Sequence, residues 1–125
     1  MGSPRSHTAV SRPDGDIVLL EHVTDCIARI ASHSRGSREC FMNSELVQDA
    51  VIRNLQALAE STSRLSESIK ATEPDVPWSE IKALRNRLTH GYLAINLNIV
   101  REVVEQNLPE LDNAIRRMRS RKPSA

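Results

Sequence analysis

Aromatic residues are nearly absent from this 125-residue chain, which has one Trp, one Tyr and one Phe. Its core must therefore be aliphatic, and a nucleic-acid platform of several stacked aromatics is excluded. Cysteine is also scarce, because Cys26 and Cys40 are too few for a disulfide framework and lack the spacing of a zinc site. We interpret both as small hydrophobic side chains in a reducing compartment.

Long apolar runs are missing as well. No stretch of the sequence approaches the about 18 apolar residues of a membrane span, and the first residues have no apolar segment typical of a signal peptide. We therefore expect a cytoplasmic protein with no membrane association. The mass of 14.0 kDa predicts one domain, which is large enough to fold without a disulfide or a metal ion.

The net charge of +1 hides an uneven distribution. The last ten residues carry five positive charges and no acid, whereas the other 115 residues hold 12 basic and 16 acidic side chains. This basic end can contact a phosphate backbone, or it can be a solvated helix end whose cations complement the helix dipole. Its basic residues are Arg116, Arg117, Arg119, Arg121 and Lys122.

Apolar residues recur at helical spacing along most of the chain, and no segment shows the alternation of a β-strand. We predict an all-α fold, an antiparallel (up-and-down) four-helix bundle with room for a fifth, short helix. Residues 1–13, rich in serine and proline, are predicted to be a flexible leader. Residues 14–119 form the helical domain, and residues 120–125 a flexible basic tail.

Polar and helix-breaking residues set the expected limits of the first two helices. Asp14 or Asp16 is expected to cap the first helix, and residues 34–37 to end it. The second helix is expected to run from Asn43 or Ser44 to about residue 70, before a break at residues 71–77.

The third helix is expected to begin near Pro77 and to end around residues 90–91. Asn96 or Asn98 is expected to cap a fourth helix, which Pro109 kinks or restarts. The apolar stripes of these helices predict a core. Its members are Leu20, Ile27, Leu55, Leu58, Trp78, Ile81, Leu84, Val100, Val103 and Leu111.

Polar side chains concentrate at the end of the third predicted helix, in the segment ALRNRLTHGY of residues 83–92. Asn86 and His90 are four residues apart and lie on one helix face. Arg85 and Tyr92, seven apart, would also align if the helix continued past Gly91. The segment is a candidate for chemistry that needs a cation and a titratable group.

Each of these residue types has a role in cleaving RNA without a metal ion. The guanidinium of Arg85 can bind phosphate oxygens, the imidazole of His90 can exchange a proton near neutral pH, and Asn86 can orient the imidazole or bind phosphate. The 2′-hydroxyl of RNA is a built-in nucleophile, so the enzyme supplies a base, an acid and a cation. The alternative is structural: the histidine satisfies a helix-end carbonyl, and the arginine pairs with a glutamate. No other histidine, no glycine-rich loop and no cluster of metal-ligand spacing suggests a cofactor or a metal site.

The segment Arg85-Asn86-Arg87-Leu88-Thr89-His90-Gly91-Tyr92 resembles the Arg-x4-His-x-Tyr motif of the HepT-like toxins, a family of the HEPN superfamily. The resemblance extends over about residues 14–118. It includes QDAVIRNLQALAESTSRLS (48–66), PDVPWSEIKALRNRLTHGY (74–92) and IVREVVEQNLPEL (99–111).

The resemblance implies the toxin of a two-gene toxin–antitoxin pair of the type VII kind, a metal-independent endoribonuclease that works as a homodimer. Its antitoxin would be an MntA-type nucleotidyltransferase that silences the toxin by transferring AMP to the motif tyrosine. By direct match, Arg85 and His90 would be catalytic, Asn86 would support them, and Tyr92 would be modified. For Tyr92 a plain alternative remains, a half-buried aromatic that covers one end of the bundle.

The sequence departs from the family pattern at three places. Ala59-Glu60-Ser61 stands where the family often has Gly-Glu-Ala, and Leu93 and Arg101 stand where it often has an aromatic residue. These positions lie outside the catalytic motif. The runner-up function is a non-catalytic HEPN module that binds a nucleotidyltransferase and a nucleotide. A DNA-binding repressor is disfavoured because the body of the chain is acidic and shows no recognition helix.

Overall fold

The computed structural model describes residues 13–34, 37–90 and 96–121. Within these ranges the chain is helical and contains no strand. Of the predicted flexible leader the structure describes only residue 13, and of the predicted tail only residues 120 and 121, the first of which still belongs to α7. Tyr92 lies outside the described residues. The elements are α1 (Pro13–Ser34), α2 (Arg38–Met42), α3 (Glu45–Ser63), α4 (Glu67–Lys70), α5 (Trp78–His90), α6 (Leu97–Glu102), the π-helical segment η3 (Val103–Asn107) and α7 (Leu108–Ser120).

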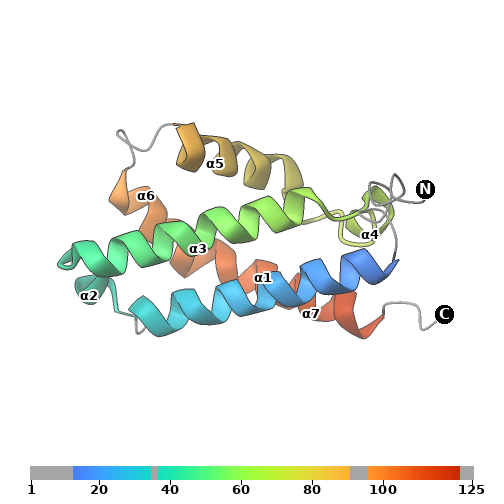
Figure 1. Cartoon of the computed structure of the whole chain (residues 1–125), viewed down its shortest axis with the longest axis horizontal. Coiled ribbons are helices and arrows are strands. Elements are labelled where there is room, and N and C mark those ends of the chain that lie inside the picture. Colours follow the sequence, from blue (N-terminus) through green and yellow to red (C-terminus); the bar gives the residue numbers. More distant parts are fainter. Residues whose placement is uncertain (1–12, 35–36, 91–95, 122–125) are drawn as a thin grey trace, which may run out of the picture.

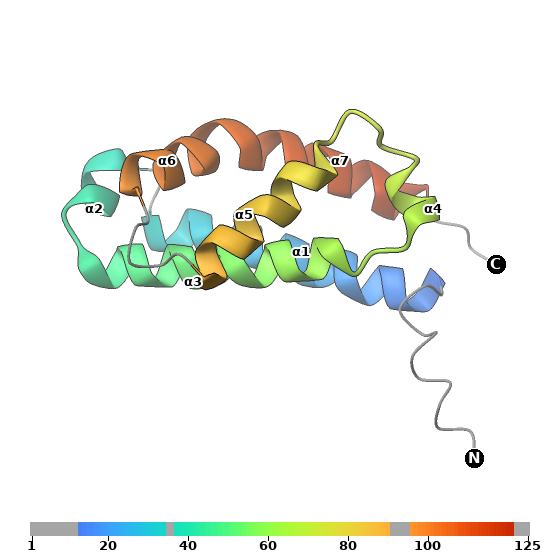
Figure 2. The same ribbon diagram turned by 90° about the horizontal axis from the view of Figure 1, so that it is seen from above.

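Four long segments form the predicted antiparallel bundle: α1, α3, α5 and the continuous α6–η3–α7 (Figures 1 and 2). The helix α1 packs against α3 on one side and α7 on the other, whereas α5 packs against α3. Figure 2 shows α5 crossing α3 obliquely. The all-α prediction is confirmed, with α2 and α4 as short additional helices.

Local capping determines where two of the predicted helices begin. The Ser44 Oγ accepts a hydrogen bond from the Val47 backbone N–H at 3.2 Å, which starts α3. The Asn96 Oδ1 accepts from the backbone N–H of Asn98 at 2.9 Å, which starts α6. Both residues were among the predicted caps.

The prediction that Asp14 or Asp16 caps the first helix is wrong, because α1 begins at Pro13 and contains both residues. The buried carboxylate of Asp16 accepts two hydrogen bonds from Ser66, from the backbone N–H at 2.9 Å and from the hydroxyl at 2.6 Å. Ser66 also caps α4 by accepting from the Ile69 N–H. The predicted second helix is therefore interrupted after Ser63, because Asp16 holds the backbone at residue 66 out of the helix.

The last helix contains the irregularity that Pro109 predicted. The backbone N–H of Leu108 donates to Val103 O, five residues back, so residues 103–107 form a π-helical turn before α7 starts. Proline has no N–H and its ring clashes with the carbonyl four residues before it in an α-helix. The wider turn relieves that clash, and α6 and α7 remain one continuous segment (Figure 2).

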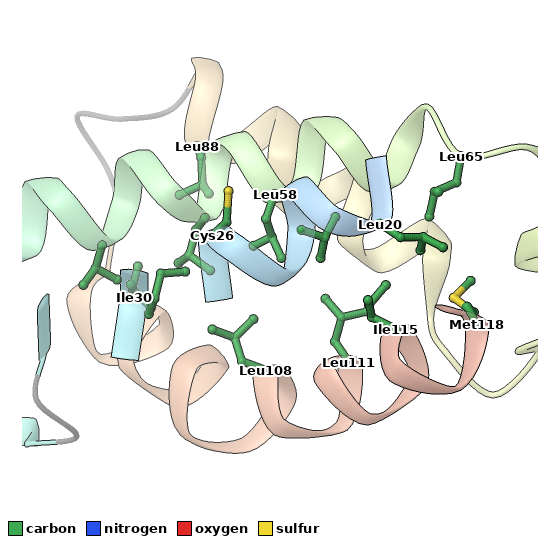
Figure 3. Close-up of a cluster of buried hydrophobic side chains, with 14 of the residues drawn as sticks. Leu20, Cys26, Ile30, Leu58, Leu65, Leu88, Leu108, Leu111, Ile115 and Met118 are labelled. Carbon is green, nitrogen blue, oxygen red and sulfur yellow. The ribbon is translucent and has the colours of Figure 1, made fainter. Parts of the chain in front are cut away.

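The core is mainly aliphatic, as expected, but it includes Phe41 of α2, which is fully buried. Its other apolar side chains come chiefly from α1, α3, α5, α6 and α7, and Figure 3 shows those of α7 directed toward α1 and α3. Half of the predicted core is fully buried (Leu20, Leu55, Leu58, Val100 and Leu111). The other half is partly exposed and packs against the core (Ile27, Trp78, Ile81, Leu84 and Val103). Both cysteines are free, Cys26 buried and Cys40 half-buried.

A buried glutamate ties the connection before α5 to α7. The Glu73 carboxylate accepts hydrogen bonds from Arg117 at 2.8 and 3.1 Å and from Arg121, and these partners lower the pKa of Glu73 to about 2. The Trp78 indole N–H donates to the carbonyls of Lys70 and Glu73. These contacts fix the N-terminal end of α5.

In the described ranges, no helix is long and apolar enough to span a membrane.

Candidate active site

The helix α5 presents two different faces. Ile81, Leu84 and Leu88 follow one another at steps of three and four and pack on the core, Leu88 being buried. Arg85 belongs to this inward face, because it follows Ile81 by one helical turn, and its side chain is 27% exposed. The arginine is therefore held against the bundle rather than displayed on the outer surface.

Glu60 of α3 holds the Arg85 guanidinium. The Arg85 Nε lies 3.6 Å from the Glu60 Oε1, and this buried Nε has no hydrogen-bond partner. The pair is therefore an electrostatic contact at a distance too long for a hydrogen bond. This contact keeps the positive charge at the α3–α5 edge, and no guanidinium N–H of Arg85 donates a hydrogen bond to Glu60.

Asn86 and His90 lie on the exposed face of α5. They are four residues apart and share this face, as the spacing predicted, and both are solvent-exposed. Among the residues that the structure describes, neither side chain makes a hydrogen bond or an ion pair. His90 is the last residue of α5, and Gly91, where the predicted end also falls, lies outside the described residues.

Arg85 and His90 are not brought to one face. Five residues correspond to about 140° around an α-helix after one full turn, so the guanidinium faces α3 while the imidazole faces solvent. The structure places Arg85, Asn86 and His90 within two turns of one helix, and it brings together only the last two. Tyr92, two residues beyond α5, lies outside the described residues.

Comparison with known proteins identifies the family. A family model described as "Ribonuclease HepT-like" matches residues 23–118, which include the whole of α5. The chain belongs to the HepT-like ribonuclease family. This membership supports ribonuclease activity in general terms.

Relatives of this HepT-like chain carry matching names. A protein of Thermococcus cleftensis named "Probable ribonuclease HepT" is 27% identical over 80% of this chain and 92% of its own length. A protein of Caldanaerobacter subterraneus named as a "Putative RNase" is 28% identical over 78% of this chain and 88% of its own length. A third, a "Putative RNase" of Methanocaldococcus jannaschii, is 35% identical over 55% of this chain and 57% of its own. No solved structure matches the chain.

Two residues of α3 that sequence patterns did not indicate hold α5 of the HepT-like chain in place. Glu60 pairs with Arg85, and the Gln56 amide donates to the Thr89 hydroxyl at 3.3 Å. Gln56 and Glu60 are four residues apart, so they form one polar strip along α3. That spacing predicts a polar strip on α3, but the sequence does not show that α5 is the helix that packs against the strip.

No candidate metal centre emerges from the part of the chain that the structure describes, where no group of three or more His, Cys, Asp or Glu side chains could hold an ion. The chemical groups at the end of α5 are a guanidinium, an amide and an imidazole. This set can bind a phosphate, orient it and transfer a proton.

Proposed function

We propose that this chain is the toxin of a toxin–antitoxin pair and cleaves RNA as a metal-independent endoribonuclease. The proposal is carried by α5, which keeps the Arg85 guanidinium at its edge with α3 and exposes the His90 imidazole five residues later, at the end of the helix. The family assignment supports the same class of activity.

The reaction needs one base, one acid and one cation. An imidazole takes the proton of the 2′-hydroxyl, whose oxygen attacks the adjacent phosphorus, while the Arg85 guanidinium stabilises the negative charge of the phosphorane. The bond from phosphorus to the 5′-oxygen breaks, and an imidazolium protonates that oxygen. The products are a 2′,3′-cyclic phosphate and a 5′-hydroxyl, and no oxidant or cofactor takes part.

Each chain supplies one motif histidine, whereas the reaction uses an acid and a base. A homodimer with its two-fold axis beside the exposed face of α5 would bring two His90 side chains to one cleft, together with two Arg85 groups. The exposure of Asn86 and His90 is consistent with this arrangement. The composite site also accounts for the absence of a paired acid–base couple on α5 itself.

The decisive experiment is cleavage of RNA in EDTA by the wild-type protein and by His90→Ala. We expect the wild type to leave cyclic phosphate ends and the variant to be inactive. Lys82→Ala, which removes another exposed polar side chain of α5, is the matched control and should remain active. Activity that requires added magnesium would contradict the mechanism.

We also propose that an MntA-type nucleotidyltransferase silences this toxin by transferring AMP to Tyr92. A phosphodiester attached two residues after His90 would compete with substrate phosphate for Arg85, and its adenosine would obstruct access. Tyr92→Phe should therefore keep nuclease activity but escape silencing. Intact-mass measurement after incubation with the transferase and ATP should show added AMP on the wild type only, and a modified Phe variant would refute the assignment.

The alternative is a non-catalytic HEPN module that holds a nucleotidyltransferase and binds nucleotide. The Arg85–Glu60 ion pair is the observation in its favour, because such a contact also serves a structural role. The same cleavage assay separates the two functions. Equal lack of cleavage by wild type and His90→Ala would select the binding module.

A further inference from the structure

One side of the bundle is open. The helix α5 packs on α3, and α7 packs on the opposite side against α1, so α5 and the α6–α7 segment do not close on each other. Figure 2 shows α5 crossing obliquely from the side of α7 to that of α3. Side chains of α3, α5, α6, η3 and α7 line a groove of about 600 Å³ along this side.

The groove is apolar inside. Leu55 and Leu58 of α3 and Leu111 of α7, which also belong to the buried core, form part of its lining. Ile81 and Leu84 of α5 border it on one side. The opposite border is Ile99 of α6, which is 44% exposed and belongs to the few large apolar side chains at the surface.

The charged residues around the groove are unevenly distributed. Asp75, Glu80 and Glu110 lie near the N-terminal end of α5 and on the first turn of α7. Arg117, at the same end, is already bound to the buried Glu73. The other basic lining residue is Arg87, two turns along α5 from Glu80. One end of the groove is therefore acidic and the other basic.

We propose that this groove is the docking site for an amphipathic helix of a protein partner, with an aliphatic face and basic residues in its first turns. The aliphatic face would cover the lining leucines. The basic residues, together with the positive end of the helix dipole, would lie against Asp75, Glu80 and Glu110, and its C-terminal end would lie near Arg87. About three turns fit alongside the 13-residue α5.

Two other occupants fit less well. An RNA strand would place phosphates against an apolar lining whose acidic groups outnumber the uncommitted Arg87. A second copy would need a protruding apolar ridge, whereas the exposed large apolar side chains outside the groove in the described ranges are Val18 and Leu46, on α1 and at the start of α3. The proposal does not depend on ribonuclease activity.

The test uses two synthetic 14-residue helical peptides that share a leucine face and lack aromatic residues. One carries lysines in its first two turns, and the other carries glutamates at the same positions. Trp78 is the single tryptophan of the chain and starts α5, so its fluorescence reports binding. We expect the lysine peptide to bind about tenfold more tightly at low salt, with the difference shrinking as salt is added.

Charge reversal on the protein sharpens the test. Glu80→Lys combined with Glu110→Lys should reverse the preference, so that the glutamate peptide binds more tightly. Ile99→Glu should abolish binding of both peptides, whereas Leu46→Glu, at an 80% exposed leucine away from the groove, should leave binding intact. Circular dichroism of each variant shows that it is folded.

Any of four outcomes would overturn the proposal. The two peptides could bind with equal affinity, or Ile99→Glu could leave binding unchanged. Ile99→Glu could instead dissociate a dimer in sedimentation experiments, which would assign the groove to a second copy. Binding of an RNA oligonucleotide to the wild type but not to Ile99→Glu would assign the groove to RNA.

Discussion

Two arginine–glutamate pairs in this molecule differ in how fully each arginine is engaged. Arg117 and Arg121 donate hydrogen bonds to the buried carboxylate of Glu73, which lowers its pKa. Arg85 lies 3.6 Å from a half-exposed Glu60 without a hydrogen bond between them. Arg117 is thus committed to the fold, and Arg85 can exchange Glu60 for a phosphate at little cost.

The first prediction at the residue scale concerns Arg85. Arg85→Ala should reduce the rate of RNA cleavage by about 100-fold or more, because charge on the phosphorane loses its cation. Its melting temperature should change little, since a single partly exposed ion pair contributes little stability. Arg87→Ala, two positions along the same helix, is the control and should keep activity, as measured with a fluorogenic RNA. Equal loss in both variants would point to a general effect of positive charge.

The second prediction at the residue scale concerns how the free energy of unfolding depends on pH. The pKa of Glu73 is about 2 in the folded chain, against 4.5 for an ordinary glutamate, so its contribution to stability is complete above pH 4.5 and is lost as the pH falls toward 2. Urea unfolding between pH 6 and 2.5, values chosen to bracket this window, should show a flatter pH profile for Glu73→Gln than for wild type. Glu67→Gln, at a 93% exposed side chain, should keep the wild-type slope.

At the scale of the element, α5 should be held mainly by its inward residues. Leu88→Ala should lower the free energy of unfolding by about 2–5 kcal/mol, because this side chain is buried in the core. Leu84→Ala should cost less, because Leu84 borders the groove and is only partly buried. Chemical denaturation of both variants gives the comparison, and an equal or larger effect at Leu84 would mean that the groove is closed in solution.

Sequence reasoning succeeded for elements whose limits depend on neighbouring residues. Ser44 and Asn96 cap helices through contacts two or three residues away, and Pro109 acts on its own turn. It failed where the determinant is distant, because Asp16 and Ser66 are 50 residues apart and together interrupt the second predicted helix. The five-residue α2, whose N-cap is Ser37, is also too short for an apolar period to reveal.

For the candidate site too, local features could be predicted from the sequence, whereas a contact with a distant residue could not. The shared face of Asn86 and His90 follows from helical spacing alone. The inward direction of Arg85 was also available, since it continues the stripe of Ile81, Leu84 and Leu88. The partner of Arg85 could not be predicted, because Glu60 lies on another helix and only packing brings α3 and α5 together.

At the scale of the whole molecule, the proposed dimer makes a prediction that depends on site sharing. Sedimentation should give twice the 14.0 kDa of the chain. A heterodimer of one wild-type and one His90→Ala chain should lose nearly all activity if both histidines serve one cleft. Two independent sites would instead leave about half, and a fully active monomer would exclude the composite site.

The attachment of α5 to one neighbour has a consequence for how this protein loses function. Hydrogen exchange measures the free energy of opening each segment, and a helix held on one side can open without the rest of the molecule. The amides of α5 should therefore exchange sooner than those of α1 or α3, which are covered on more sides. A chain whose α5 is detached would still give a helical spectrum and a cooperative melt, while its guanidinium and imidazole would no longer be held in place. Inactivation and unfolding are then separate events, with separate midpoints.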